Sequence, residues 1–103
     1  MNSERRQAER VPITAPLIFR TANAVEGDGH TLNVSRTGLS FSTPVSPGSS
    51  PEVLVYFKLA GRQYLAQGQI VRTAQNQVAI VFREAPRGLE QLLAPLEKPE
   101  NPN

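Results

Sequence analysis

Apolar and polar positions alternate along most of the chain, in short runs separated by glycine, proline or asparagine residues. Alternation with a period of two places one set of side chains on each face of an extended strand. These runs predict six strands, over residues 17–20, 30–35, 39–43, 53–59, 64–71 and 78–82. Six short strands with close turns between them favour a small antiparallel barrel or sandwich.

Turn residues mark the places where the chain is expected to reverse. Residues 21–29 and residues 46–51 are rich in glycine, proline, serine or asparagine, so both segments predict loops. Two tight turns are predicted at Ala60-Gly61 and at Gln75-Asn76. Gly68 stands inside a predicted strand, where it indicates a bend or bulge of the kind that helps to close a barrel.

A helical period follows the last predicted strand. Four leucines recur at positions i, i+3, i+4 and i+7, which is one face of a helix: Leu89, Leu92, Leu93 and Leu96. Pro86 suits the first turn of this helix, and Pro95 is expected to end it near Ala94. The leucine face needs apolar cover, and the open end of a barrel is the expected docking place.

Length and composition indicate one small domain. A chain of 103 residues buries a single modest core. Residues 1–10 are mostly polar and predict a flexible N-terminal arm, and residues 97–103 predict a disordered tail. The folded domain is therefore expected over residues 11–96.

Charge and residue types exclude several classes of function. The net charge of +2 is too small for a protein that binds long nucleic acid. The chain has no cysteine, which excludes disulfides and thiolate metal sites. No apolar run approaches the ~20 residues of a membrane span, and the polar N-terminus is unlike a signal peptide. A cytoplasmic protein without a membrane partner is expected. Glu26, Asp28 and His30 are expected to be solvated polar residues and not metal ligands.

Arginine dominates the basic residues, which matters for ligand chemistry. Nine of the eleven basic residues are arginines, and Arg5, Arg6 and Arg10 stand in the N-terminal arm. A guanidinium donates paired hydrogen bonds to a phosphate, or to O6 and N7 of guanine, and it stacks on purine rings. The arm is therefore predicted to contact an anionic ligand that carries guanine.

A second cluster, Asn33, Ser35 and Gly38, lies where one predicted strand turns into the next. If Leu32 and Val34 face the core, Asn33 and Ser35 point outward together, about 7 Å apart. Gly38 permits a positive φ or a close approach of a ligand to the main chain. These residues predict a polar wall for a ligand, while ordinary turn chemistry is the simpler alternative.

Arg6 and Arg10 form the pattern RxxxR, and Asn33, Ser35 and Gly38 form the pattern (D/N)xSxxG. In this order and spacing, and with strands after them, the patterns resemble the two signatures of the PilZ domain family over residues 5 to about 94. The resemblance implies an all-β fold with one helix: a six-stranded antiparallel β-barrel of the split-barrel type and a C-terminal α-helix. It also implies a receptor for the bacterial second messenger cyclic di-GMP, which is not an enzyme and has no cofactor.

The resemblance further implies that the N-terminal arm becomes ordered on the ligand and that a separate, unidentified effector protein receives the signal. Arg5 extends the first pattern to RRxxxR, which in the family is linked with an intercalated pair of ligand molecules. One alternative is a PilZ-fold protein–protein adaptor without nucleotide binding. Another is a small barrel for single-stranded nucleic acid, which requires exposed aromatic side chains. Five of the six aromatics are expected to face the core: Phe19, Phe41, Phe57, Tyr64 and Phe82.

Overall fold

A computed structural model of the chain describes residues 9–97. Arg5 and Arg6 lie outside the described residues, and so do the predicted flexibility of residues 1–8 and the predicted disorder of residues 98–103. The expectations for these segments stay predictions.

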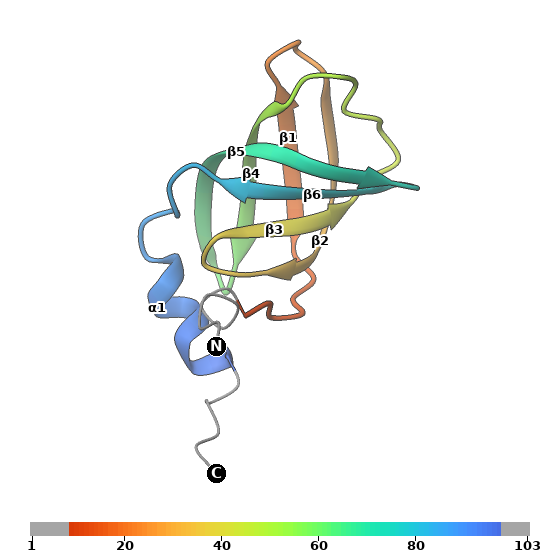
Figure 1. Ribbon diagram of the computed structural model, residues 1–103. Coiled ribbons are helices and arrows are strands. Elements are labelled where there is room, and N and C mark those ends of the chain that lie inside the picture. Colours follow the sequence, from red (N-terminus) through yellow and green to blue (C-terminus); the bar gives the residue numbers. More distant parts are fainter. Residues whose placement is uncertain (1–8, 98–103) are drawn as a thin grey trace, which may run out of the picture.

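Six antiparallel strands form a closed barrel (Figure 1). Around the barrel the strands follow the order β1-β2-β3-β6-β5-β4, and the pairing of β1 with β4 closes the sheet. The strands are β1 (Pro16–Thr21), β2 (Glu26–Val34), β3 (Gly38–Ser42), β4 (Glu52–Leu59), β5 (Arg62–Ala74) and β6 (Gln77–Phe82). The predicted six-stranded barrel is confirmed, and the sandwich that the strand pattern alone left open is excluded.

The period of two in the sequence determines which side chains fill the barrel. In β4 every second side chain is buried, as predicted: Val53, Val55, Phe57 and Leu59. The five aromatics expected to face the core are 7% exposed or less. Phe19 packs on Phe41 and Phe57 packs on Tyr64, each pair with ring centroids 5.4 Å apart. Because aromatic side chains bury large apolar areas, these rings contribute much of the core's stability.

The two predicted hairpin turns are present and have the backbone geometry that tight hairpins need. Ala60 and Gly61 have φ values of 52° and 77°, and Gln75 and Asn76 have φ values of 39° and 65°. Two consecutive residues with positive φ are typical of the type I′ turn, whose twist matches that of the flanking strands.

Gly68 lies in β5 as predicted, but the bulge in that strand is elsewhere. The register between β5 and β6 shifts between Ile70 and Arg72. A Cβ atom at Gly68 would lie 2.6 Å from the carbonyl oxygen of Val81, so glycine allows β6 to approach β5 closely.

Strand β2 differs from the prediction at its start and near its end. It begins at Glu26, so part of the predicted loop over residues 21–29 is strand. Its register with β3 shifts between Thr31 and Asn33, which is a β-bulge with one extra residue. The extra residue reverses the alternation, so that Thr31 is fully buried and Leu32 is 36% exposed. The expectation that Leu32 faces the core is therefore wrong.

A short helix covers one end of the barrel (Figure 1). It consists of α1 (Leu89–Leu93) followed by a 3₁₀ turn, η2 (Ala94–Leu96). Leu89 and Leu93 are fully buried and belong to the same apolar cluster as the barrel core. The predicted docking of the helix is confirmed, although Leu96 is 52% exposed and does not belong to the buried face.

The start of α1 lies close to β5. Gly88 precedes the helix with a φ of 88°, a conformation that glycine adopts without strain. A Cβ atom there would lie 4.0 Å from Cε1 of Tyr64, so the helix start rests near the Tyr64 ring. The Tyr64 hydroxyl is buried and, among residues 9–97, has no hydrogen-bond partner.

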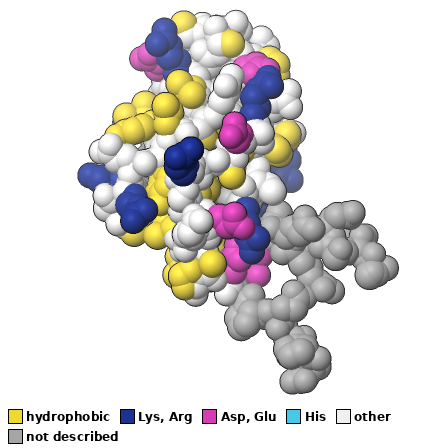
Figure 2. Space-filling model, turned by 90° about the vertical axis from the view of Figure 1, so that its left-hand side faces the viewer, with side chains coloured by type: hydrophobic (Ala, Val, Ile, Leu, Met, Phe, Trp, Pro, Cys, Tyr) yellow, Lys and Arg dark blue, Asp and Glu magenta, His cyan; other side chains and the backbone are white. Residues whose placement is uncertain are grey.

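Some large apolar side chains lie on the outside of the barrel. Figure 2 shows hydrophobic side chains at the surface among basic and acidic ones. Three of the exposed apolar residues, Ile18, Tyr56 and Leu65, lie opposite one another in a row across β1, β4 and β5. Within residues 9–97, no helix has the length and apolar character that crossing a membrane requires.

Candidate functional site

A backbone bridge brings the two sequence motifs together. Val11 and Val34 exchange two main-chain hydrogen bonds, with nitrogen–oxygen distances of 2.8 and 2.9 Å. Arg10 and Asn33 each directly precede a bridge residue. Their side chains meet, and Nη1 of Arg10 donates to Oδ1 of Asn33 at 2.8 Å. One residue of the N-terminal arm and one residue of the second motif therefore lie side by side on the barrel.

Thr31 fixes the segment that follows Arg10. Its buried Oγ1 accepts a hydrogen bond from the main-chain nitrogen of Ala15 at 2.8 Å and donates to the carbonyl oxygen of Ile13 at 2.5 Å. The main-chain nitrogen of Thr31 also donates to the carbonyl oxygen of Ala15, at 2.8 Å. The connection between the arm and β1 is thus bound to β2, which limits where Arg10 can lie.

Ser35 does not lie on the outer wall. It is 1% exposed, and its Oγ accepts hydrogen bonds from the main-chain nitrogens of Thr37 at 3.2 Å and Gly38 at 3.1 Å. A serine that binds main-chain N–H groups two and three residues on stabilises a tight turn. The expectation that Asn33 and Ser35 point outward together is wrong, since β2 ends at Val34 and Ser35 already belongs to the turn, where the alternation of the strand no longer holds. Ser35 shapes the turn between β2 and β3.

Gly38 is needed for the packing of β3 on β6. A Cβ atom at this position would collide with the carbonyl oxygen of Ile80. Gly38 lies opposite Val81 in the strand pair, so the collision would fall inside the sheet. Its φ is not in the positive region, unlike that of Gly88. A close approach between strands is therefore the structural reason for glycine here.

Arg36 lies in the same turn, and the sequence analysis did not single it out. Its Nε and Nη2 donate to the two carboxylate oxygens of Glu97 at 3.0 and 2.7 Å, and its Nη1 lies 3.5 Å from Oε2 of Glu90. This paired contact joins the β2–β3 turn to the end of the C-terminal helix. Glu97 was expected as the first residue of a disordered tail, and in the structure it contacts this turn. The partners are 61 positions apart, so no local pattern indicates the pair.

Arg36 lowers the pKa of Glu97 below its ordinary value. The hydrogen bonds from Arg36 are the main cause, burial of the carboxylate opposes them, and the positive charge of Arg36 adds to the lowering. A carboxyl group whose pKa is lowered by folding stabilises the folded state above its unfolded pKa. This contribution is lost as the pH falls through the folded pKa.

We therefore expect Glu97→Gln to lower the melting temperature at about pH 7 and to have a smaller effect at about pH 3. Thermal melts of the two proteins across this range measure the difference. Glu84→Gln, which changes an exposed carboxylate, is the control. A melting-temperature difference for Glu97→Gln that stays constant from neutral to acidic pH contradicts the assignment.

The described site residues divide into two groups. Arg10 and Asn33 meet at the surface, while Ser35 and Gly38 build the adjoining turn. Arg10 supplies a guanidinium and Asn33 an amide at this surface, while the guanidinium of Arg36 is already paired with Glu97 and Glu90. Guanidinium groups donate hydrogen bonds to phosphate, and an amide both donates to and accepts from a base edge. The arrangement suits recognition of an anionic nucleotide.

The fold and these contacts define a class of protein, a small closed β-barrel with arginine and amide side chains gathered beside one turn. The sequence model of the PilZ domain matches residues 4–96, which is nearly the whole chain, and the chain belongs to the PilZ domain family. This is a family of cyclic di-GMP receptors, whose domains typically act in binding and not in catalysis.

The solved structures that resemble the chain include a PilZ domain and an inhibitor of motility. The PilZ domain of CeSA from a cellulose-synthesizing bacterium has a TM-score of 0.60 and 21% identity, and the match covers 71% of this chain and 78% of that one. The Bacillus subtilis inhibitor of motility (MotI/DgrA) has a TM-score of 0.67 and 17% identity. That match covers 85% of this chain and 47% of the other, so the chain spans about half of the motility inhibitor. Comparison with curated proteins finds no match.

Proposed function

We propose that this PilZ domain is a receptor for cyclic di-GMP that passes its signal to a separate partner protein. The observation that carries the proposal is the contact between Arg10 and Asn33, which places one residue of each family motif side by side. Arg6 is four positions from Arg10, and four residues span at most about 14 Å. Arg5 and Arg6 are therefore included in the proposed site.

The chemistry of cyclic di-GMP fits these side chains. The ligand carries two phosphates and two guanine bases, and a guanidinium binds either group through paired hydrogen bonds. Each charged hydrogen bond contributes about 1.5–3 kcal/mol net, and micromolar affinity needs about −8 kcal/mol. Several such contacts are needed to reach this affinity, because ordering the groups that make them costs free energy. The Val11–Val34 bridge and Thr31 already hold the segment beside Arg10, which reduces that cost.

Isothermal titration calorimetry with cyclic di-GMP tests the proposal, with cyclic di-AMP as the control ligand. We expect saturable binding of cyclic di-GMP with a dissociation constant of about micromolar order. Cyclic di-AMP should bind far more weakly, because adenine lacks the O6 acceptor of guanine. If cyclic di-GMP gives no heat at high micromolar protein concentration, the proposed function is wrong.

The burial of Ser35 favours a second candidate, a PilZ-fold protein–protein adaptor without nucleotide binding. With Ser35 inside, the second motif offers Asn33 alone to the outer wall, which leaves fewer polar groups for a ligand. If the protein is such an adaptor, titration with cyclic di-GMP gives no heat. Its binding to a partner protein would also be unchanged by cyclic di-GMP and by Arg10→Ala.

A further inference from the structure

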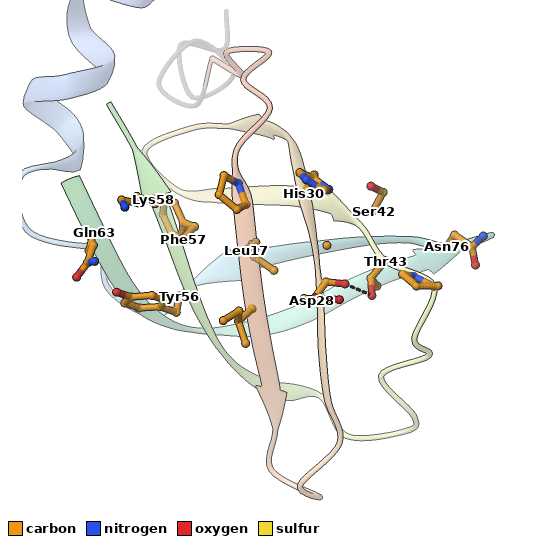
Figure 3. A pocket seen from close by; sticks show the side chains of 14 residues that line it. Leu17, Asp28, His30, Ser42, Thr43, Tyr56, Phe57, Lys58, Gln63 and Asn76 are labelled. Carbon is orange, nitrogen blue, oxygen red and sulfur yellow. Dashed lines mark hydrogen bonds between the residues drawn. The ribbon is translucent and has the colours of Figure 1, made fainter. Parts of the chain in front are cut away.

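A groove with a volume of about 760 Å³ crosses the outer wall of the barrel (Figure 3). Small-molecule sites are commonly of this size and are lined mostly by apolar groups with a few polar ones. Strand pairing defines the wall beneath it. Tyr56 of β4 lies opposite Ile18 of β1, and Ile18 lies opposite Asp28 of β2. The groove therefore runs across the strands, and its lining comes from several of them.

The middle of the groove is apolar. Pro16 and Ile18 line it from β1, and the ring of Tyr56 lines it from β4. Ile18 is 55% exposed and Tyr56 is 38% exposed, so this apolar surface is in contact with water. Covering such a surface with a flat apolar group is favourable, because it removes apolar area from water.

Two opposite charges flank this apolar middle. Lys58 and Asp28 both line the groove, and Figure 3 shows them on opposite sides of β1. Their strands are two strand spacings apart, about 10 Å, which is too far for a direct ion pair. Elsewhere on the wall Arg20 and Arg83 pair with Glu26 and Glu52, whereas among residues 9–97 neither Lys58 nor Asp28 is in an ion pair.

The backbone of the wall argues against an extended peptide as the occupant. Peptides that bind to sheets add a strand to an exposed edge, where main-chain groups are unpaired. Under the apolar middle of this groove β1 is paired on both sides, with β2 and with β4. An occupant of the groove therefore has to bind through side-chain contacts, as a small molecule does.

We propose that the groove binds a guanine nucleotide, at a place separate from the Arg10–Asn33 contact and independent of the proposed cyclic di-GMP site. The base covers Ile18 and stacks on the ring of Tyr56. Its N1–H and 2-amino group donate to the two carboxylate oxygens of Asp28, and Lys58 binds the phosphate. Adenine lacks both donors, so Asp28 selects guanine. Asn33 lies five positions beyond Asp28 along β2, about 17 Å away.

The main chain of Asp28 is fixed, which helps it to select a base. Oγ1 of Thr43 donates to the carbonyl oxygen of Asp28 at 2.8 Å, the contact drawn as a dashed line in Figure 3. This hydrogen bond connects Asp28 to the chain just after β3. The Asp28 carboxylate therefore projects from a part of β2 that is held by its pairing with β1 and by the Thr43 side chain.

The test is an NMR titration of the full chain with GMP, with AMP as the control ligand. GMP at about 1 mM is expected to shift the amide signals of Asp28, Tyr56 and Lys58. AMP is expected to bind at least about tenfold more weakly, because a paired hydrogen bond discriminates between bases by roughly that factor. Asp28→Asn should abolish this preference, and Lys58→Met should weaken both nucleotides. Both side chains are exposed, so the melting temperatures of these variants should stay close to that of the wild type.

Other results would overturn the proposal. GMP shifts that are absent, or confined to the surroundings of Arg10 and Asn33, exclude the groove. Equal binding of GMP and AMP, or full GMP selectivity in Asp28→Asn, removes the role of Asp28. Signals of the groove that change with protein concentration alone would show that a second copy of the chain covers it. Arg10→Ala serves as the separate control, because it should impair the cyclic di-GMP site and leave the GMP shifts in the groove unchanged.

Discussion

Replacing Arg10 with alanine is expected to weaken cyclic di-GMP binding by about 10- to 100-fold. The reason is that the guanidinium supplies charged hydrogen bonds, each worth about 1.5–3 kcal/mol, and about 1.4 kcal/mol corresponds to a factor of ten. The Arg10–Asn33 contact already holds this guanidinium beside the second motif. Calorimetric titration of both proteins measures the change.

Two comparisons sharpen this result. Arg20→Ala removes another arginine whose side chain is 62% exposed and paired with Glu26, and it should bind as the wild type does. Arg10→Lys keeps the charge but loses the planar fork, so its affinity should lie between those of wild type and Arg10→Ala. If Arg10 and Asn33 bind the ligand jointly, the double variant Arg10→Ala/Asn33→Ala loses less binding free energy than the two single variants lose in sum. Wild-type affinity in Arg10→Ala would refute the site.

Replacing Leu93 with alanine is expected to lower the free energy of unfolding by about 2–5 kcal/mol, as deletion of a fully buried leucine side chain does. Leu93 is 0% exposed and belongs to the same cluster as the barrel core, although it lies in a helix of five residues. A helix that short has little stability of its own. The apolar contact with the barrel end must therefore hold it in place. Chemical denaturation with urea measures the loss.

Leu96→Ala is the matched control for this measurement. Leu96 follows in the same C-terminal segment but is 52% exposed, so the same change should alter stability by no more than about 0.5 kcal/mol. Equal losses at Leu93 and Leu96 would mean that the two leucines are buried alike, which contradicts the docking described here.

Much of the barrel is predictable from the sequence because most strands keep an unbroken period of two. Residues 53–59 show this best, since alternate side chains there are buried as expected. Strand β2 is harder, because Gly27 and Gly29 resemble loop residues. A Cβ atom at Gly27 would lie 2.8 Å from the Phe19 ring, and one at Gly29 would collide with the carbonyl oxygen of Ser42. Glycine is needed in this strand because residues remote in sequence crowd these positions, and a local sequence pattern carries no information about those neighbours.

The candidate site was predictable only in part, for a related reason. The spacing of the motifs identified Arg10 and Asn33, which do meet. The bulge between Thr31 and Asn33 depends on pairing with β3, so counting residues along β2 placed Leu32 on the wrong side. Ser35 was misplaced because β2 ends at Val34, before the position to which the alternation was extended. The contact of Arg36 with Glu97 depends on where the C-terminal helix docks. The bulge and the Arg36–Glu97 contact both come from tertiary pairing, whereas the burial of Ser35 comes from its own turn.

Closure of the sheet determines how fast this chain can reach its native state. Leu17 pairs with Phe57 and Leu39 pairs with Ile80, so two of the six strand pairs join segments that are remote along the chain. The entropy of bringing such segments together is lost before their contacts stabilise anything. Small proteins dominated by remote pairings acquire their structure in about milliseconds to seconds, whereas helical bundles need microseconds to milliseconds. Slow folding in a single kinetic step is therefore expected for this chain, with a strand pair between remote segments forming late.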